Sequence, residues 1–539
     1  MIVACGRGAP LLDDPSKQDG GSGLPAGAPI DATARCQAAI DARSSVGCDY
    51  WAVHMDGAFA AQNGCFAVFL ANTSDAPARV EATFGGMTVD LAEHARLPRG
   101  SGRALAYEPL APDGVPPGDV AILFLAGPPT TGTPRTTDFT TPTECPVAPA
   151  WSALTQVKGT GLGHAFHVKT SAPVVAYQML PYGGGDAAVT GATLLLPANV
   201  WGTNYVATGA YDGLSGEGWA APSMNIVARE DHTTVTILPN QKLEGGVRVP
   251  GGPANAPVSL VLGAGEHWQI TQSADLAGSA IQSDKPVGLF AGTPCFAVPL
   301  GHPYCDHSEQ QIPSVQQLGH DYVAAPYRSR STKPEAPPWR VIGVADGTRL
   351  TWSRAVGGPA TLGRGQVASF TTDEAFRVRA QDADHPFLLV GYMTGASTVE
   401  EGYGDPDFVR VVPRDQWLDR YVFFTDPTYP ETNLVVVRGR GPNGFADVTL
   451  DCAGALGGWT AIDADHELAR VDLVRHDFAP QGGCDNGRHE MRSAQPFALT
   501  VWGWGTPETS TYTSYVSYGY PAGQSARSLT TVTLPPDPR

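Results

Sequence analysis

Residues 295–318 read CFAVPLGHPYCDHSEQQIPSVQQL, with the apolar run SDKPVGLFAGTP before them and GHDYVAAPY after them. The stretch contains two cysteines, two histidines, an aspartate and a glutamate, which are residue types that ligate metals or serve in nucleophilic catalysis. Both flanking runs belong to phrases that recur along the chain. We therefore interpret the stretch as a disulfide-closed joint between two β units, with Asp306, His307 and Glu309 as turn and surface residues.

Four sequence phrases recur at intervals of about one hundred residues. The first is a proline followed by an apolar run, in SAPVVAYQ, SDKPVGLF, ADHPFLLVGY and SAQPFALTVW, at Pro173, Pro286, Pro386 and Pro496. The second places a tyrosine four residues after an apolar residue, at Trp201 and Tyr205, Leu318 and Tyr322, and Trp417 and Tyr421. Because separate phrases keep a similar step, the chain is predicted to contain tandem copies of one unit.

The other two phrases are an acidic turn before an alternating strand and a glycine turn before a second strand. The acidic turn begins DHTTVTIL at Asp231 and DGTRLTWS at Asp346, and FADVTLD around Asp447 is a weaker copy. The glycine turn begins LGAGEHWQI at Leu262 and LGRGQVASF at Leu362. These runs are short, rich in β-branched residues and closely punctuated by Gly and Pro, which is typical of strands.

The fold class predicted from these phrases is all-β, built from tandem repeated units of about 100 residues that are β-sandwich-like. The alternative is a β-propeller-like ring, in which each copy would supply two blades because a blade takes about 40–50 residues. The expected segments are 1–34, a lipobox-like terminus and tether; 35–185, a first unit with a long Gly/Pro/Thr loop; 186–310, 311–410 and 411–521, three further units; and 522–539, a frayed tail.

Nine cysteines indicate an oxidising compartment. Setting Cys5 aside, proximity favours disulfides Cys295–Cys305 and Cys452–Cys484, and elimination leaves Cys36–Cys48 and Cys65–Cys145. The sequence Ile2-Val3-Ala4-Cys5 has the form of a bacterial lipobox, although the charged region and most of the apolar region of a signal peptide are missing. We expect an extracellular or bacterial outer-surface protein lipidated at Cys5, the alternative being an unprocessed start with a free cysteine.

The charge of the chain restricts its partners. The formal net charge is −18, so nucleic acid and anionic membrane surfaces are repelled, and membrane contact is expected only through a lipid anchor. No apolar run approaches the ~18 residues of a spanning helix. The partner is therefore expected to be an unidentified extracellular protein or glycan.

Three clusters contain residue types suited to chemistry, and each has a structural interpretation. His302, Cys305, His307 and Glu309 are metal ligands by type, but an oxidised Cys305 cannot ligate. The pair His164 and His167 is interpreted as exposed or hydrogen-bonded. The loop with Glu400, Glu401, Asp405 and Asp407 offers calcium ligands but lacks EF-hand spacing, so a solvated loop is favoured. We expect no catalytic residue, no metal and no cofactor.

Aromatic residues crowd the last unit at Trp502, Trp504, Tyr512, Tyr515, Tyr518 and Tyr520. Tyrosine and tryptophan are favoured at binding surfaces because they combine rigid apolar area with a polar group. They are equally favoured as cross-strand pairs. Both interpretations stay open, and no binding residue is assigned.

Several of these phrases resemble one known family. They are SAPVVAYQ with the following LLLP…WGTNYV, the run DLAGSAIQSDKPVGLFAG, and the joint C…VP…CDHSEQQIP…LGHDYV. Together they resemble the amino-terminal domain of the IgG Fc-binding protein family over residues 50–520, most specifically over 275–322. The resemblance implies a secreted or surface-attached, bacterial-type binding or adhesive module without known catalysis. Antibody binding is not carried over, because no ligand-contact motif is available to transfer.

The function predicted from sequence is a non-enzymatic extracellular or cell-surface protein that binds or adheres to protein or glycan ligands. One alternative is a secreted carbohydrate-active or other hydrolase, which a deep cleft lined by two or more carboxylates would favour. The second alternative is a structural envelope protein, which would self-assemble without a ligand.

Overall fold

The computed structural model describes residues 32–131, 141–183, 189–209, 220–299, 304–399 and 402–535. Cys5, His302, Glu400 and Glu401 lie outside these residues, as does the side chain of Tyr512. The regular secondary structure of the described part of the chain is almost entirely β-strand, with one α-helix, α1 (Ala32–Ala42). The prediction of an all-β fold made of sandwich-like units is confirmed. The helices of the described residues are too short or too polar to cross a bilayer.

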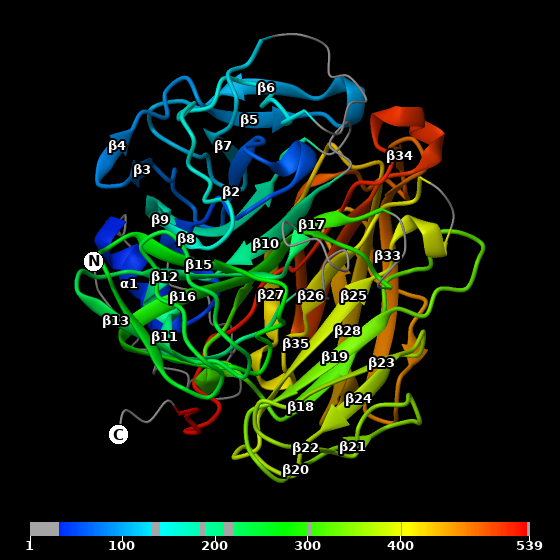
Figure 1. The fold of residues 1–539 in the computed structure, drawn as a ribbon. Helices are drawn as coiled ribbons and strands as arrows, with labels where there is room; N and C mark the ends of the chain where they lie inside the picture. The colour runs from blue at the N-terminus through cyan, green and yellow to red at the C-terminus, as the bar shows by residue number, and fades with distance from the viewer. Residues whose placement is uncertain are drawn as a thin grey trace, which may run out of the picture.

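The strands form four consecutive units (Figure 1). The first contains β1 (Val46–Ala52), β2 (Phe66–Asn72), β3 (Val80–Phe84), β4 (Met87–Val89), β5 (Ala95–Arg99), β6 (Ala106–Pro109), β7 (Val120–Ala126), β9 (Phe166–Leu180) and β10 (Gly191–Leu195). The second contains β8 (Gly161–His164), β11 (Gly202–Val206), β12 (Ser223–Ala228), β13 (Thr233–Leu238), β14 (Val258–Leu262), β15 (Glu266–Thr271), β16 (Ala280–Phe296) and β17 (Asp306–Ile312).

The third and fourth units come next along the chain. The third contains β18 (Asp321–Ala324), β19 (Pro338–Gly343), β20 (Thr348–Arg349), β21 (Thr351–Trp352), β22 (Thr361–Leu362), β23 (Val367–Thr371), β24 (Phe376–Arg379), β25 (Phe387–Met393) and β26 (Asp407–Arg410). The fourth contains β27 (Leu418–Thr425), β28 (Glu431–Gly441), β29 (Gly444–Phe445), β30 (Val448–Leu450), β31 (Gly454–Ala455), β32 (Thr460–Ala461), β33 (His466–Arg475), β34 (Ala479–Pro480), β35 (Gly487–Trp504) and β36 (Ser517–Pro521).

Short 3-10 turns connect these strands. They are η1 (Phe59–Ala61), η2 (Gly102–Ala104), η3 (Ala198–Val200), η5 (Val315–Gln317), η6 (Ala396–Thr398), η7 (Arg414–Gln416) and η8 (Pro507–Tyr512). The turns η3, η5 and η7 lie between successive units, immediately before the recurrent tyrosine phrase.

Each unit is curled around one strand that passes from one layer to the other. In β9, the first half pairs with β1 and β3, and the half after Pro173 pairs with β2, β10 and the first two residues of β1. Pro286 and Pro496 occupy the same position in β16 and β35, and in the third unit the strand is divided into β24 and β25, with Pro386 just before β25. Proline cannot donate a ladder hydrogen bond, so it suits the point at which a strand changes partners.

The tyrosine phrase and the proline phrase are bonded to each other in every unit. The Tyr205 hydroxyl donates to the carbonyl of Val287, which follows Pro286 (2.5 Å). The equivalent bonds join Tyr50 to Val174 (2.7 Å), Tyr322 to Phe387 (2.6 Å) and Tyr421 to Phe497 (2.5 Å). All four tyrosines are buried. The recurrence seen in the sequence therefore reflects one contact that is repeated four times.

Changing Tyr205 to phenylalanine is expected to lower the free energy of unfolding by about 1–3 kcal/mol, because it leaves a buried carbonyl and the Gly202 N–H (3.0 Å from the hydroxyl) without a partner. Urea denaturation followed by circular dichroism would measure it. The control is Tyr304→Phe, at a side chain that is 44% exposed, which should change stability by less than about 0.5 kcal/mol. An equal loss at both positions would contradict the role of the buried hydroxyl.

The acidic turn and the glycine turn also meet. The Asp231 carboxylate accepts from the N–H of Ala264 (2.8 Å), and Asp346 accepts from the N–H of Arg364 (2.9 Å). The two contacts lie at the same positions of the second and third units. They explain why these phrases keep their spacing.

The four units close a ring instead of forming a row. The last strand of each unit, β10, β17, β26 or β36, pairs with the end of the long strand of its own unit. These four inner strands also contact one another in a cycle, β10 with β17, β17 with β26, β26 with β36, and β36 with β10. Figure 1 shows β10, β17 and β26 in the middle of the molecule, with the units around them.

The two ends of the described chain complete the ring. Ser44 pairs with Ser525, the Ser45 N–H donates to Gln524 (2.8 Å), and the Ala526 N–H donates to Arg43 (2.7 Å). Residues 522–535 continue along the body, and Leu534 is buried and bonded to Asn204. The expectation of a frayed tail was therefore wrong for residues 522–535, because their backbone and apolar side chains are held by the first, second and fourth units.

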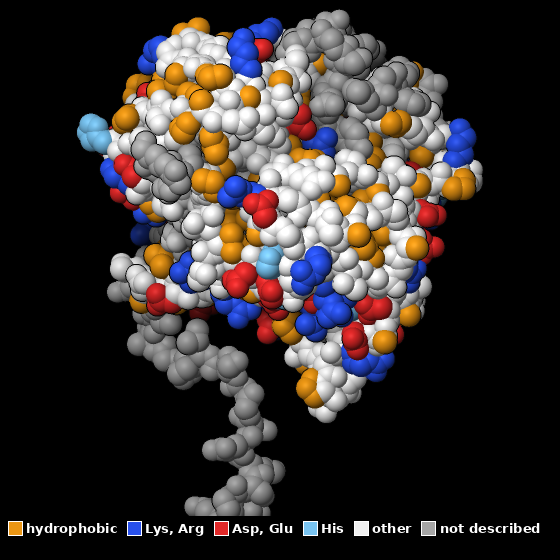
Figure 2. Space-filling view, turned by 60° about the horizontal axis from the view of Figure 1, so that its bottom comes forward, with side chains coloured by type: hydrophobic (Ala, Val, Ile, Leu, Met, Phe, Trp, Pro, Cys, Tyr) orange, Lys and Arg blue, Asp and Glu red, His pale blue; other side chains and the backbone are white. Residues whose placement is uncertain are grey.

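Four disulfides cross-link segments of the chain. They are Cys36–Cys48, Cys65–Cys145, Cys295–Cys305 and Cys452–Cys484, which is the pairing that the sequence favoured. Each of these disulfides lies within one unit, whereas apolar packing joins neighbouring units: the Phe69 and Phe424 rings of the first and fourth units stack at 4.8 Å. On the face shown in Figure 2, acidic and basic side chains are interspersed and apolar ones lie in small groups.

Candidate functional site

The strand β17 carries the polar residues of the CDHSEQQ motif, and it lies in the interior. All seven of its residues are buried, and Asp306, His307 and Glu309 are each 0% exposed. The prediction that these three are turn and surface residues was therefore wrong. Their burial follows from the ring, because β17 pairs with β16 and is enclosed by the inner strands of the other units.

Asp306 and Gln310 connect β17 to two other units. The Asp306 carboxylate accepts from the Ser517 hydroxyl (3.1 Å) and from the backbone N–H of Thr190. The Gln310 amide donates to the carbonyls of Gly519 (2.8 Å) and Ala192 (3.0 Å). Polar side chains of the motif therefore hold the first, second and fourth units together at the centre of the ring.

The third unit adds Asp405 and Asp407 to this centre. The solvated acidic loop that the sequence favoured is not found at these two residues, which are almost fully buried. Burial raises the pKa of Asp405 to about 8 and that of Asp407 well above its ordinary range. Burial, and then the charges of Asp405 and Asp407, also raise the pKa of Asp306. These carboxyls therefore hold protons at pH values at which exposed carboxyls are ionised.

On the side of β17 that faces the junction of the first two units, His307 and Glu309 meet further buried polar groups. Glu309 accepts from the Gln178 amide (2.7 Å) and lies 3.8 Å from the His307 Nε2. Burial lowers the pKa of both His54 and His267 to about 3, with a smaller contribution from neighbouring histidines. Among the described residues, the ring nitrogens of His267 have no hydrogen-bond partner.

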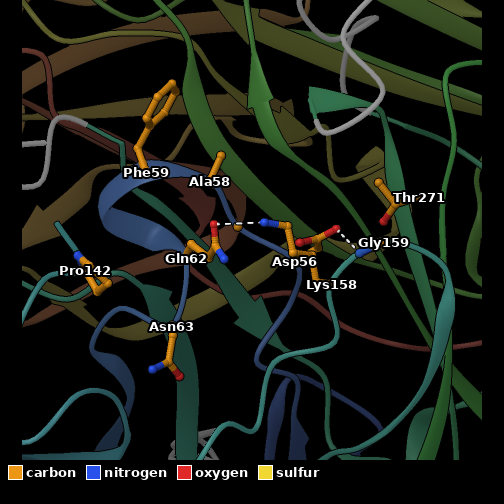
Figure 3. A pocket seen from close by; sticks show the side chains of 10 residues that line it. Asp56, Ala58, Phe59, Gln62, Asn63, Pro142, Lys158, Gly159 and Thr271 are labelled. Atoms are coloured by element: carbon orange, nitrogen blue, oxygen red, sulfur yellow. Dashed lines mark hydrogen bonds between the residues drawn. The ribbon is translucent and has the colours of Figure 1, made fainter. Parts of the chain in front are cut away.

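A pocket of about 610 Å³ opens between the first and second units, close to this cluster (Figure 3). It is lined by Asp56, Gly57, Ala58, Phe59, Gln62, Asn63, Pro142, Lys158, Gly159 and Thr271. The Asp56 carboxylate accepts from the Gly159 N–H (2.8 Å), and the Lys158 ammonium donates to the Gln62 side chain (3.3 Å). Burial raises the pKa of Asp56 to about 6.

The stretch 295–318 forms part of the wall behind this pocket. The Cys295–Cys305 disulfide packs against Ala58, with Phe59 beside it. Sequence reasoning missed the pocket, because its lining comes from several separate segments and no local motif marks it.

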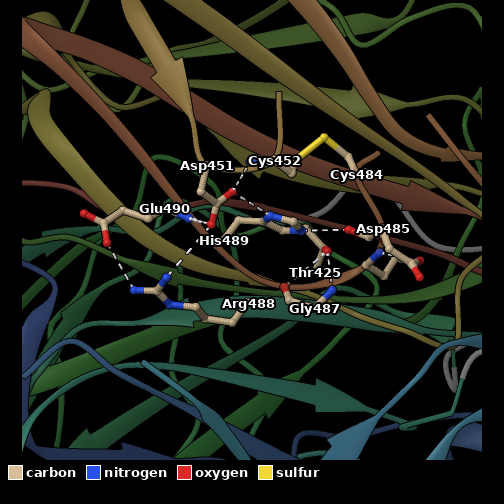
Figure 4. The surroundings of a disulfide bond; sticks show 10 residues. Thr425, Asp451, Cys452, Cys484, Asp485, Gly487, Arg488, His489 and Glu490 are labelled. Carbon is tan, nitrogen blue, oxygen red and sulfur yellow. Dashed lines mark hydrogen bonds and ion pairs between the residues drawn. A yellow bond between two sulfur atoms is a disulfide. The ribbon is translucent and has the colours of Figure 1, made fainter. Parts of the chain in front are cut away.

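A second cluster, Asp451, Cys452 and His489, has metal-ligand types within 4.8 Å of one another. Figure 4 shows that its members are already engaged. Cys452 is bonded to Cys484, and His489 contacts the Asp451 carboxylate (3.0 Å) and the Asp485 carbonyl (2.7 Å). A disulfide sulfur is not a thiolate ligand, so this set does not fit a metal ion.

The aromatic residues of the last unit are mostly internal. Trp502, Trp504, Tyr518 and Tyr520 are buried, so they serve as packing residues and not as an exposed binding surface. Tyr515 is partly buried and stacks on Tyr304 at 5.0 Å. His167 stacks on Trp51 at 3.9 Å and bonds Asp49 (2.7 Å), and His164 is partly buried on β8, which agrees with their structural interpretation.

The protein is a ring of four β-sandwich-like units that contains four disulfides. The buried strand that carries the CDHSEQQ motif lies at the centre of this ring. The family model described as IgGFc binding protein matches residues 191–503, which is more than half of the chain. The chain belongs to this family.

The human IgGFc-binding protein is 26% identical over 297 residues, which is 52% of this chain and 5% of that protein. The chain thus spans about a twentieth of the length of this relative. Among solved structures, a point mutant of the major pilin of Streptococcus pyogenes has 8% identity and a TM-score of 0.13, covering 59% of this chain and 99% of the pilin chain.

Proposed function

We propose that the chain is an extracellular or cell-surface binding protein that recognises a protein or glycan partner and catalyses no reaction. The observation that carries the proposal is membership in the IgGFc binding protein family over residues 191–503. The human relative is described by its name as a protein that binds IgG Fc. Four disulfides support the extracellular compartment.

The placement of the reactive side chains favours binding over hydrolysis. Cys305 is in a disulfide, and His307 and Glu309 are buried at the centre of the ring. Among the described residues, the pocket between the first two units is lined by a single carboxyl group, that of Asp56, whereas glycoside hydrolysis usually uses two.

Attachment to a bacterial outer surface through a lipid on Cys5 belongs to the same proposal. It is supported by the lipobox-like sequence around Cys5. Mass spectrometry of the mature amino terminus tests it: a mass increase equal to the lipid is expected on Cys5, and an unmodified cysteine there would contradict the anchor.

The binding proposal is tested with the purified, oxidised chain immobilised on a sensor surface. The ligands are IgG Fc fragment, a mucin glycoprotein and an oligosaccharide array. We expect saturable binding to at least one of them, and lack of binding to all three would contradict the proposal. Sedimentation of the chain alone separates the envelope alternative, which requires ordered self-assembly without ligand.

A further inference from the structure

The polar groups of the pocket between the first and second units converge on one space. In Figure 3, Asp56, Gln62 and Lys158 lie close together, with Thr271 beside Asp56. Gln62 and Lys158 are exposed, so they are accessible to a ligand, whereas Asp56 forms the floor and is only 4% exposed. A volume of about 610 Å³ lies within the ordinary range of small-molecule sites.

The floor and walls of the pocket are fixed by two buried glutamines. Gln269 accepts from the Asp56 N–H (3.1 Å) and donates to the carbonyls of Val157 (2.8 Å) and Gly159 (2.6 Å). Gln156 accepts from the Asn63 N–H (2.9 Å) and donates to the carbonyl of Met55 (2.6 Å). Each glutamine bridges two segments of the pocket wall, so the lining is held in place before any ligand arrives.

The chemistry of the lining selects the class of ligand. In the part of the lining that the structure describes, one carboxyl and one ammonium nearly balance in charge, and the amides and the Thr271 hydroxyl can both donate and accept. A hydroxyl-rich, uncharged ligand matches such a surface, because each hydroxyl also donates and accepts. Of the described lining residues, those with apolar side chains are Ala58, Phe59 and Pro142, which is less than the predominantly apolar lining of most small-molecule pockets.

We propose that this pocket binds an uncharged carbohydrate, whose hydroxyl groups bond to Asp56, Gln62 and Lys158. The inference rests on the proposed binding function and adds the ligand class and the place of binding. The motif stretch 295–318 then supports the site from behind through the Cys295–Cys305 disulfide, without touching the sugar itself.

The test uses the full oxidised chain on an array of immobilised neutral, sialylated and sulfated oligosaccharides, followed by titration of the best binders. The variants are Lys158→Ala, Gln62→Ala and Asp56→Asn, the last of which keeps an oxygen to accept the Gly159 N–H. The control is Lys169→Ala, at an exposed lysine of β9 that does not line the pocket. The variants and the wild type should share one circular dichroism spectrum and melting temperature.

We expect the wild type to bind neutral oligosaccharides, Lys158→Ala and Gln62→Ala to weaken binding about tenfold or more, and Lys169→Ala to leave it unchanged. Sugar binding that the pocket variants do not weaken would overturn the inference and leave the proposed function intact. So would binding only to a protein partner or only to charged oligosaccharides. A chain that binds neither sugars nor the protein ligands of the sensor experiment overturns both.

Discussion

Replacing Arg330 with methionine is expected to lower the free energy of unfolding by about 3–5 kcal/mol, because it leaves the buried Glu335 carboxylate without its counter-ion. The Arg330 and Glu335 side chains are 0% and 2% exposed, and their charged atoms are 2.7 Å apart. Arg330 also donates to the carbonyls of Thr394 (2.5 Å) and Tyr403 (2.8 Å). Although burial alone would raise the pKa of Glu335, the Arg330 guanidinium holds it below its ordinary value.

Two further variants separate this pair from an ordinary surface contact. Arg364→Met removes a half-exposed arginine that lies 3.8 Å from Asp346, and it should cost no more than about 1 kcal/mol. Arg330→Met combined with Glu335→Leu should recover much of the loss, since no unpaired charge then remains in the interior. Chemical denaturation of all variants at one pH measures these differences. A double variant as unstable as Arg330→Met alone would show that the pairing is not what matters.

The second large effect is a dependence of stability on pH at the junction of the first two units. Between pH 7.5 and pH 5, the wild type should lose about 2 kcal/mol more of its free energy of unfolding than the His267→Gln variant loses. The reason is that the pKa of His267 is about 3 in the folded protein, against 6.5 ordinarily, because the ring is buried. Its contribution is full above pH 6.5 and is lost as the pH falls toward 3, since the unfolded chain takes up the proton first.

The quantity to measure is the difference in the free energy of unfolding between variant and wild type, because other buried groups make contributions with the opposite dependence on pH. The raised pKa of Asp405, about 8, gives a contribution that is full below about pH 3.8 and is lost as the pH rises through 8. Urea titrations of wild type and variant at a series of pH values cancel that contribution. The control is His232→Asn, at an exposed residue whose left-handed backbone (φ 55°) asparagine tolerates. Parallel curves for wild type and His267→Gln would refute the prediction.

The repeated phrases made the fold predictable from sequence. The strands could be predicted because each phrase combines β-branched residues with nearby Gly or Pro. Counterparts of Tyr205 and Pro286 recur because the contact between these two phrases forms in each unit. Proximity along the chain indicated two of the disulfides, Cys295–Cys305 and Cys452–Cys484, and elimination left the other two. A ring was only the alternative architecture, and the sequence did not select it, because Ser44 and Ser525 carry no signal that they pair.

The candidate site was the part that the sequence did not reveal. A run such as Asp306 to Gln311 reads as a surface segment, because charged and amide residues are seldom fully buried. Its burial depends on partners from the three other units, such as Thr190, Asp407 and Ser517. Asp56 and Lys158 lie about a hundred residues apart in the sequence, and only the packing of the first two units brings them to one pocket.

The pairing of Ser44 with Ser525 has a consequence for the evolution of this architecture. In an open solenoid, a repeat can be gained or lost while the remaining repeats keep their neighbours. Here the first and last segments of the chain are neighbours, so a fifth copy would separate them and a missing copy would prevent them from meeting. Duplication of a single unit is therefore not a neutral event, whereas an insertion in an outer loop leaves the contact between the two ends in place.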